Sequence, residues 1–135
     1  MELDPKILKQ CEDYAKDADG SFKITDDFEE GFDGAHVVYP KAWAPSIFFK
    51  PPVGNDDEEG SHAIFDKHKD WKTTARHMEM ADKNAIYMHC LPADRGYEVT
   101  NEVMDKISGA GWTSAIYDQA ENRLHGQKAV MSLLM

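Results

Sequence analysis

The chain has 135 residues, 41% of them hydrophobic, which is enough for one domain with a moderate core. Acidic side chains outnumber basic ones by 25 to 15, and the formal net charge of -10 disfavours binding to nucleic acids or anionic membranes. No apolar run approaches the ~20 residues of a membrane-spanning helix, and the first residues lack a secretory pattern, so we expect a cytoplasmic protein.

The first 60 residues predict a helix, two short elements, a strand and a long loop. Asp4 followed by Pro5 is typical of a helix start, apolar residues follow at helical spacing, and Gly20 suits the helix end. Cys11 lies on the apolar face of this helix, so we expect it in the core. The elements expected next are a strand over 21–25 (SFKIT), an acidic helix over 26–34, a buried strand over 35–39 (AHVVY) and a loop over 40–60.

The second half predicts a regular alternation of helices and strands. The expected elements are a helix over 73–83, a buried strand over 85–91 (AIYMHCL), a helix over 100–107, a strand over 114–118 (SAIYD) and a last helix. Asp118 and Glu121 are spaced like a capping box at the start of that helix. Four strands alternating with helices predict an α/β fold with a doubly wound parallel sheet and flanking helices, of the Rossmann-like class.

The stretch MHCLPADRG, from Met88 to Gly96, permits several readings of Cys90. Adjacent residues of a strand point to opposite faces, which argues against a catalytic dyad of Cys90 with His89. A zinc site lacks the usual paired spacings of cysteine or histidine, and the two cysteines are expected to be reduced thiols. Cys90 is therefore either a packed core residue or part of a pocket rim.

Topology favours the pocket rim, because ligands of open parallel sheets bind at the carboxyl ends of the strands. Cys90, Leu91 and Pro92 lie at such an end. The other candidates that follow predicted strands, or share a face of the last helix, are Lys41, Trp43, Arg95, Arg123 and Gln127. The chain has three arginines in all, so an anionic ligand depends on a few placed cations.

The segments HCLPADRGYEVT and DQAENRLHGQKAV resemble the second domain of the ornithine-type carbamoyltransferases. That family carries H-C-L-P, R-G, E-V and later E-N-R-L-H-x-Q-K-A in the same order and spacing, and coarse similarity covers essentially the whole chain. The segment YPKAWAP is more similar to the N-acetylornithine branch, in which this region forms part of a backbone knot. Glu98 matches the ornithine enzymes, since the acetylornithine enzymes have a functional lysine there.

The resemblance implies transfer of a carbamoyl group from carbamoyl phosphate to an amine, without cofactor or metal. The acceptor amine is ornithine, an N-acylated ornithine or a related compound. By the same resemblance, Cys90 and Leu91 lie against carbamoyl phosphate and the attacking amine, and Arg123 binds carbamoyl phosphate. The implied substrate-binding residues are Lys41, Trp43, His89, Leu91, Pro92, Arg95, Glu98 and Gln127.

The resemblance also implies that residues 1–135 are a single acceptor-binding domain, the C-terminal half of such an enzyme. The N-terminal domain, with its serine-threonine-arginine loop for carbamoyl phosphate, is not found in this sequence. Intact members of the family form trimers whose active sites lie between subunits, so we expect the isolated chain to be inactive. Two alternatives from other classes are a non-catalytic amino-acid-binding or regulatory domain and a small thiol-dependent enzyme.

Overall fold

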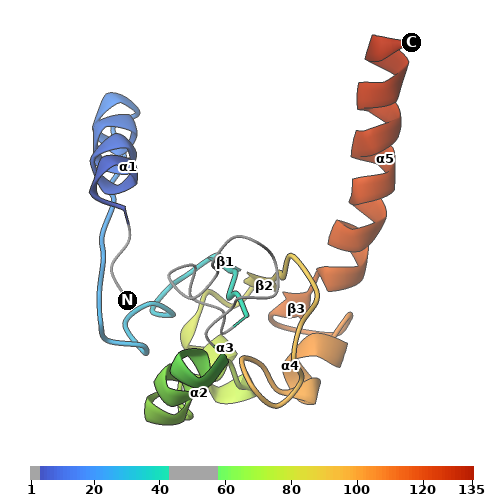
Figure 1. The fold of residues 1–135 in the computed structure, drawn as a ribbon. Helices are drawn as coiled ribbons and strands as arrows, with labels where there is room; N and C mark the ends of the chain where they lie inside the picture. Colours follow the sequence, from blue (N-terminus) through green and yellow to red (C-terminus); the bar gives the residue numbers. More distant parts are fainter. Residues whose placement is uncertain (1–3, 43–57) are drawn as a thin grey trace.

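A sheet of three parallel strands forms the centre of the molecule (Figure 1). The computed structural model describes residues 4–42 and 58–135. The strands β1 (Val37–Val38), β2 (Ile86–Tyr87) and β3 (Thr113–Ser114) lie side by side in chain order. Helices α2 (Glu58–Lys67) and α3 (Ala75–Met80) separate β1 from β2, and α4 (Asn101–Asp105) separates β2 from β3. This arrangement confirms the predicted α/β class with a parallel sheet and flanking helices.

The strands are short, and their carboxyl ends lie in register. Val38 pairs with Tyr87, and Tyr87 pairs with Ser114. The ladder continues one step further, because Met88 N donates to Val38 O at 2.9 Å and Ala115 N donates to Tyr87 O at 2.8 Å. The residues that follow the three strands are therefore held at one edge of the sheet.

The core lies around this sheet and is built mainly from β1, β2, α3, α4 and the residues that flank these elements and β3. Its buried hydrophobic residues are Phe32, Val38, Met78, Ala85, Tyr87, Val99, Val103, Met104, Trp112 and Ile116. The ring of Trp112 carries Lys106 Nζ over its face, 4.0 Å from the centroid. Burial of this cluster gives the main stabilisation of the sheet.

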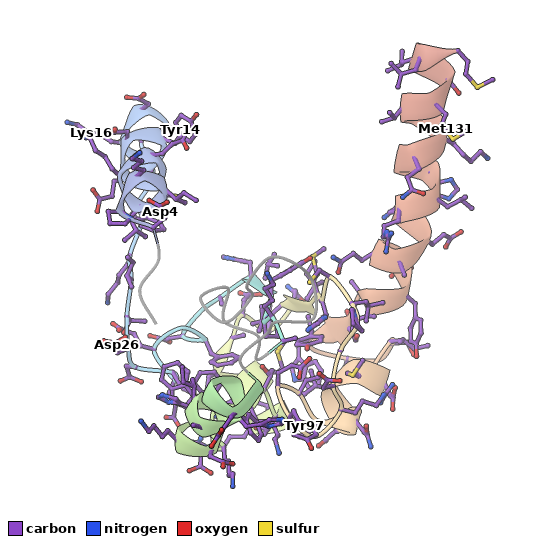
Figure 2. The ribbon with its side chains drawn as sticks, viewed as in Figure 1. Asp4, Tyr14, Lys16, Asp26, Tyr97 and Met131 are labelled. Carbon is purple, nitrogen blue, oxygen red and sulfur yellow. The ribbon has the colours of Figure 1, made fainter. Side chains whose placement is uncertain are left out.

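Two helices extend away from the core (Figure 1). Helix α1 (Pro5–Asp17) begins as predicted, with Asp4 Oδ1 accepting from Lys6 N at 2.8 Å, yet it buries no residue. The expectation that Cys11 is a core residue was wrong, because it is only half-buried. Helix α5 (Ile116–Leu134) buries only Ile116 among its described residues. Figure 2 shows the side chains of Tyr14 and Met131 on these two projecting helices.

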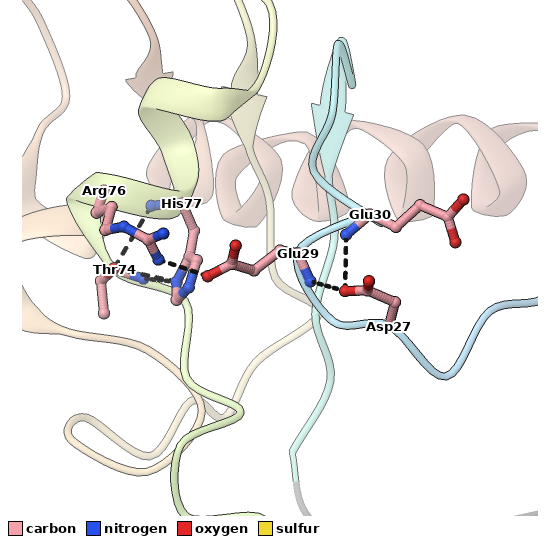
Figure 3. Close-up of polar contacts among 6 residues, drawn as sticks. All are labelled: Asp27, Glu29, Glu30, Thr74, Arg76 and His77. Carbon is pink, nitrogen blue, oxygen red and sulfur yellow. Dashed lines mark hydrogen bonds and ion pairs between the residues drawn. The ribbon is translucent and has the colours of Figure 1, made fainter.

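Two expected elements before β1 are absent. Residues 21–25 form no strand, and Phe22 and Ile24 remain exposed. An alternating sequence pattern does not by itself provide the neighbouring strand with which a strand must pair. Residues 26–34 form successive turns where a helix was expected. In these turns Asp27 Oδ1 accepts from the amides of Glu29 and Glu30, at 3.0 and 3.3 Å (Figure 3). Asp side chains that bond nearby backbone compete with helix formation.

The same turns are fastened to α3. Glu29 Oε1 accepts from Arg76 Nη1 at 2.6 Å, and Thr74 caps α3 through a reciprocal pair of bonds with His77 (Figure 3). Phe32 stacks on the His77 ring with centroids 5.1 Å apart. These contacts hold the segment before β1 against the helix that leads into β2.

Three other expectations need correction. The loop expected over 40–60 ends earlier, since α2 begins at Glu58; residues 43–57, where a knot was expected, lie outside the described part of the chain. The strand expected over 114–118 stops at Ser114, because α5 begins at Ile116. No capping box opens α5: its N-cap is Ala115 without a side-chain bond, and Asp118 lies in the first turn. None of the helices in the described residues has the length and apolar character needed to span a membrane.

Replacing a buried methionine should destabilise the sheet. Met78 is fully buried, so we expect Met78→Ala to lower the free energy of unfolding by about 2–5 kcal/mol, through lost apolar burial and a cavity. Urea unfolding of the full chain measures this loss. Met131→Ala is the matched control, since Met131 is 58% exposed and its loss should change stability by less than about 0.5 kcal/mol. Equal effects of the two substitutions would contradict the described core.

Candidate functional site

A pocket of about 240 Å³ lies where β2 ends and α5 begins. It is partly open to solvent. Its described lining consists of His89, Cys90, Leu91, Gln119, Ala120, Arg123, Leu124 and Gln127. The carboxyl end of a parallel strand is the position that topology predicted for a ligand site. The structure therefore brings together five predicted residues, His89, Cys90, Leu91, Arg123 and Gln127.

The turn after β2 forms the wall of the pocket opposite α5. Leu91 has a φ of +54°, a left-handed conformation that costs a residue with a side chain about 1–2 kcal/mol. Its backbone N–H donates to His89 Nδ1 at 2.9 Å, which offsets part of that cost. Cys90 is exposed between them. The buried His89 ring thus holds the turn in the shape that presents Cys90 and Leu91 to the pocket.

A buried polar cluster of Tyr87, His89 and Glu98 lies beneath this turn. His89 and Glu98 are 1% and 3% exposed, and His89 Nε2 lies 3.3 Å from Glu98 Oε1. Because Nδ1 accepts the Leu91 amide, a neutral His89 ring carries its proton on Nε2, which faces Glu98. Glu98 Oε1 accepts from Asp94 N at 2.8 Å, so this one side chain lies against both ends of the segment 89–94.

The hydroxyl of Tyr87 completes the cluster. Burial, and then the nearby charge of Glu98, raise the pKa of Tyr87 far above its ordinary value. The phenol is therefore neutral at physiological pH. Within the described residues, three atoms of the cluster are buried without a hydrogen-bond partner: Tyr87 Oη, His89 Nε2 and Glu98 Oε2. His89 and Glu98, predicted as substrate-binding residues, lie beneath the pocket surface and support it from below.

Arg123 supplies the charge of the pocket. It is the one charged side chain among the described lining residues besides the titratable His89. Gln119, Arg123 and Gln127 follow one another at intervals of four residues, which places them on one face of α5. In a chain with a net charge of -10, this exposed guanidinium faces the Cys90 turn and suits an anion.

Gln119 is a lining residue that sequence reasoning missed. Its Oε1 accepts from His89 N at 2.9 Å, and its Nε2 donates to Tyr39 Oη at 2.8 Å. The available signal was its position, four residues before Arg123 on the same helical face. The signal was too weak alone, because a glutamine on a helix is usually a solvated surface residue.

Arg95 is engaged elsewhere. Its Nη2 and Nη1 donate to the two carboxylate oxygens of Asp105, at 2.7 and 2.9 Å, and Nη1 also donates to Asn101 Oδ1 at 3.0 Å. The guanidinium is thus held on α4, and Arg95 is not among the described lining residues of the pocket. The expectation that Arg95 faces an acceptor has no support in this geometry.

The other predicted residues are dispersed around the edge of the sheet. Lys41 and Pro92 are exposed and lie outside the described lining, and Trp43 lies outside the described residues. Cys90 is exposed, whereas the His89 ring is buried and bonded to Leu91, so the two side chains do not form a dyad. In residues 4–42 and 58–135, no three His, Cys, Asp or Glu side chains gather as a metal-ligand group.

Comparison with known proteins assigns the chain to a family. A family profile described as "Aspartate/ornithine carbamoyltransferase, Asp/Orn binding domain" matches residues 1–134. The ornithine carbamoyltransferases of Thermococcus kodakarensis and Thermotoga maritima are each 40% identical, over 135 and 133 residues. These alignments cover 99% and 96% of this chain and 38% of each relative. The chain thus spans well under half the length of those relatives.

Solved structures agree with the sequence matches. Ornithine carbamoyltransferase from Pyrococcus furiosus superposes with a TM-score of 0.76 at 33% identity, over 98% of this chain and 38% of that one. A mutant N-acetyl-L-ornithine transcarbamylase, complexed with carbamyl phosphate and N-succinyl-L-norvaline, superposes with a TM-score of 0.78 at 33% identity. That match covers 99% of this chain and 37% of the other.

The pairing of Arg95 with Asp105 can be tested by titration. The Arg95 guanidinium, through its hydrogen bonds and then its charge, holds the pKa of Asp105 below the ordinary value. A lowered carboxyl pKa stabilises the fold above the unfolded pKa, and this contribution is lost as pH falls through the folded pKa. We expect Arg95→Ala to raise the Asp105 pKa towards its ordinary value, measured by carboxyl-carbon NMR. Glu29, whose pKa Arg76 lowers, is the internal control. An unchanged Asp105 titration would show that the pair does not form.

Proposed function

We propose that this chain, which belongs to the aspartate/ornithine carbamoyltransferase family, supplies the acceptor-binding domain of an ornithine-type carbamoyltransferase. The observation that carries the proposal is the pocket in which Arg123 of α5 faces the Cys90-Leu91 turn. An arginine opposite a preformed backbone turn suits a substrate with an anionic phosphate and a planar carbamoyl group. The chain spans 38% of its relatives, so the activity of a whole enzyme is part of the proposal.

The proposed reaction forms one bond and breaks one. An uncharged amine of the acceptor attacks the carbonyl carbon of carbamoyl phosphate and forms a C–N bond. The C–O bond to phosphate then breaks, phosphate leaves with the electron pair, and the proton lost by the amine nitrogen passes to the leaving phosphate or to solvent. Arg123 stabilises the negative charge that grows on the carbonyl and leaving oxygens. Catalysis thus rests on placement and charge stabilisation, without a covalent intermediate.

In this proposal the turn after β2 places the carbamoyl group. Cys90 forms the wall of the pocket, and the backbone of Leu91, held by His89, lies beside the reacting carbon. Gln127 continues the Arg123 face one helical turn further along α5. His89 and Glu98 act from beneath the turn, as residues that position it.

The acceptor in this proposal is ornithine or a related amino acid, since the curated relatives named above are ornithine carbamoyltransferases. Lys41 and Trp43 are proposed to face the acceptor on the resemblance of the segment YPKAWAP. A homotrimer is proposed for the intact enzyme, in which further segments complete the site. By itself the 135-residue chain should bind substrates weakly and form ureido product at a negligible rate.

Arg123 should govern binding of an anionic ligand. We expect Arg123→Ala to weaken binding of phosphonoacetyl-ornithine, a bisubstrate-like analogue, by roughly tenfold to a hundredfold, as for the loss of a charged hydrogen-bond partner. Calorimetric titration of the full chain measures the affinity. Arg76→Ala is the matched control, because Arg76 is an exposed arginine on α3 that is bonded to Glu29. Similar losses of affinity in both variants would mean that the effect comes from the change in net charge, and would contradict a specific site.

Cys90 should be shielded by the same ligand. Because Cys90 lines the pocket, we expect alkylation by iodoacetamide to slow by about tenfold when the analogue is present at roughly ten times its Kd. Mass spectrometry resolves the two thiols, and Cys11 on α1 should react at an unchanged rate. Alkylation of Cys90 at the unprotected rate, with the analogue bound, would place the ligand elsewhere.

A further inference from the structure

We infer that Gln119 is the positioning residue that sets the Cys90 turn, the segment after β1 and the Arg123 helix in one arrangement. Gln119 belongs to α5, Tyr39 directly follows β1, and His89 follows β2. The single carboxamide of Gln119 bonds to both neighbours, at 2.9 Å to His89 N and 2.8 Å to Tyr39 Oη. It therefore ties together the ends of two strands and the start of the helix that follows the third.

The chemistry of the two partners fixes how the carboxamide is oriented. A peptide N–H only donates, so the His89 amide must face Gln119 Oε1. The remaining amide nitrogen then donates to the phenol oxygen of Tyr39, which accepts. Glutamine suits the position because it offers an acceptor and a donor on one planar group. A side chain of similar size without these groups would leave both bonds unmade.

Each bond holds a residue one or two positions before a proposed substrate contact. His89 precedes Cys90 in the chain, and Tyr39 stands two residues before Lys41. Gln119 itself lies one helical turn before Arg123. Through these two bonds and its place on α5, Gln119 sets the distance between the side of the pocket proposed for carbamoyl phosphate and the side proposed for the acceptor. This role rests on the proposed function, whereas the tie itself can be tested without it.

The strand ladder does not supply this tie. The last sheet bonds in this region are Met88 N to Val38 O and Ala115 N to Tyr87 O. Beyond them, the His89 amide bonds to the Gln119 side chain rather than to a neighbouring strand. The register of the two segments past the sheet therefore depends on a side chain of α5.

Amide hydrogen exchange in the full chain tests the tie. In Gln119→Met, we expect the His89 amide to exchange about fivefold to tenfold faster, because its acceptor is gone. The Ile86 amide, which donates to His36 O within the sheet, should keep its wild-type rate and so reports that the variant is folded. Tyr39→Phe should accelerate His89 exchange less, since it removes only the outer bond.

Helix α1, far from Gln119 in sequence, offers a matched control. Gln10 Nε2 donates to Tyr14 Oη at 2.8 Å on α1, the same glutamine–tyrosine pair without a strand-end partner. Gln10→Met and Tyr14→Phe should leave both His89 exchange and ligand affinity at wild-type values. A change in either would mean that the Gln119 effect is not local.

Affinity for phosphonoacetyl-ornithine separates a positioning role from a merely structural one. We expect Gln119→Met to weaken this affinity by several-fold while the Ile86 amide stays protected, and Tyr39→Phe to weaken it less. Unchanged His89 exchange in Gln119→Met overturns the tie. Faster exchange with unchanged affinity overturns the positioning role. If the wild-type chain binds no analogue, the proposed function fails, and the exchange result alone upholds or overturns the tie.

Discussion

The hydrogen bond from the Leu91 amide to the buried His89 ring is the interaction on which the pocket depends. It stabilises the left-handed conformation of Leu91, four residues beyond the end of β2, and so turns the chain away from the direction of the strand. The ring can serve as acceptor because its other nitrogen faces Glu98 in a buried environment. A strained turn that persists because its surroundings hold it is typical of a ligand-binding segment.

Both sides of the pocket are attached to the same edge of the sheet. The turn is held from below by His89 and Glu98, and α5 starts from β3 within one residue. Arg123 and Cys90 thereby line the same pocket, although the two are 33 positions apart in sequence. In an acidic protein, this local positive charge gives an anion a defined place.

The residues of the fold that sequence patterns predicted best are those with local causes. Asp4 and Pro5 start α1 as expected, and the apolar run around Tyr87 forms the central strand. The elements that were predicted wrongly depend on contacts that the local sequence pattern does not show. SFKIT alternates like a strand but has no strand beside it among the described residues. The Asp27 side chain accepts from the amides of Glu29 and Glu30, in turns where a helix was expected. Helix α2 was missed because the acidic run that overlaps its start, residues 56–59, resembles a loop in sequence.

The sequence by itself determined the family, the class of fold and five residues of the pocket, because the motifs around Cys90 and Arg123 are contiguous and keep their spacing. Tertiary structure alone decided the roles within that set. It buried His89 and Glu98, bound Arg95 to Asp105, and joined Gln119 to Tyr39 over 80 positions of sequence. The physical reason is that burial and hydrogen-bond partners arise from segments distant in the chain, which spacing within one motif does not specify.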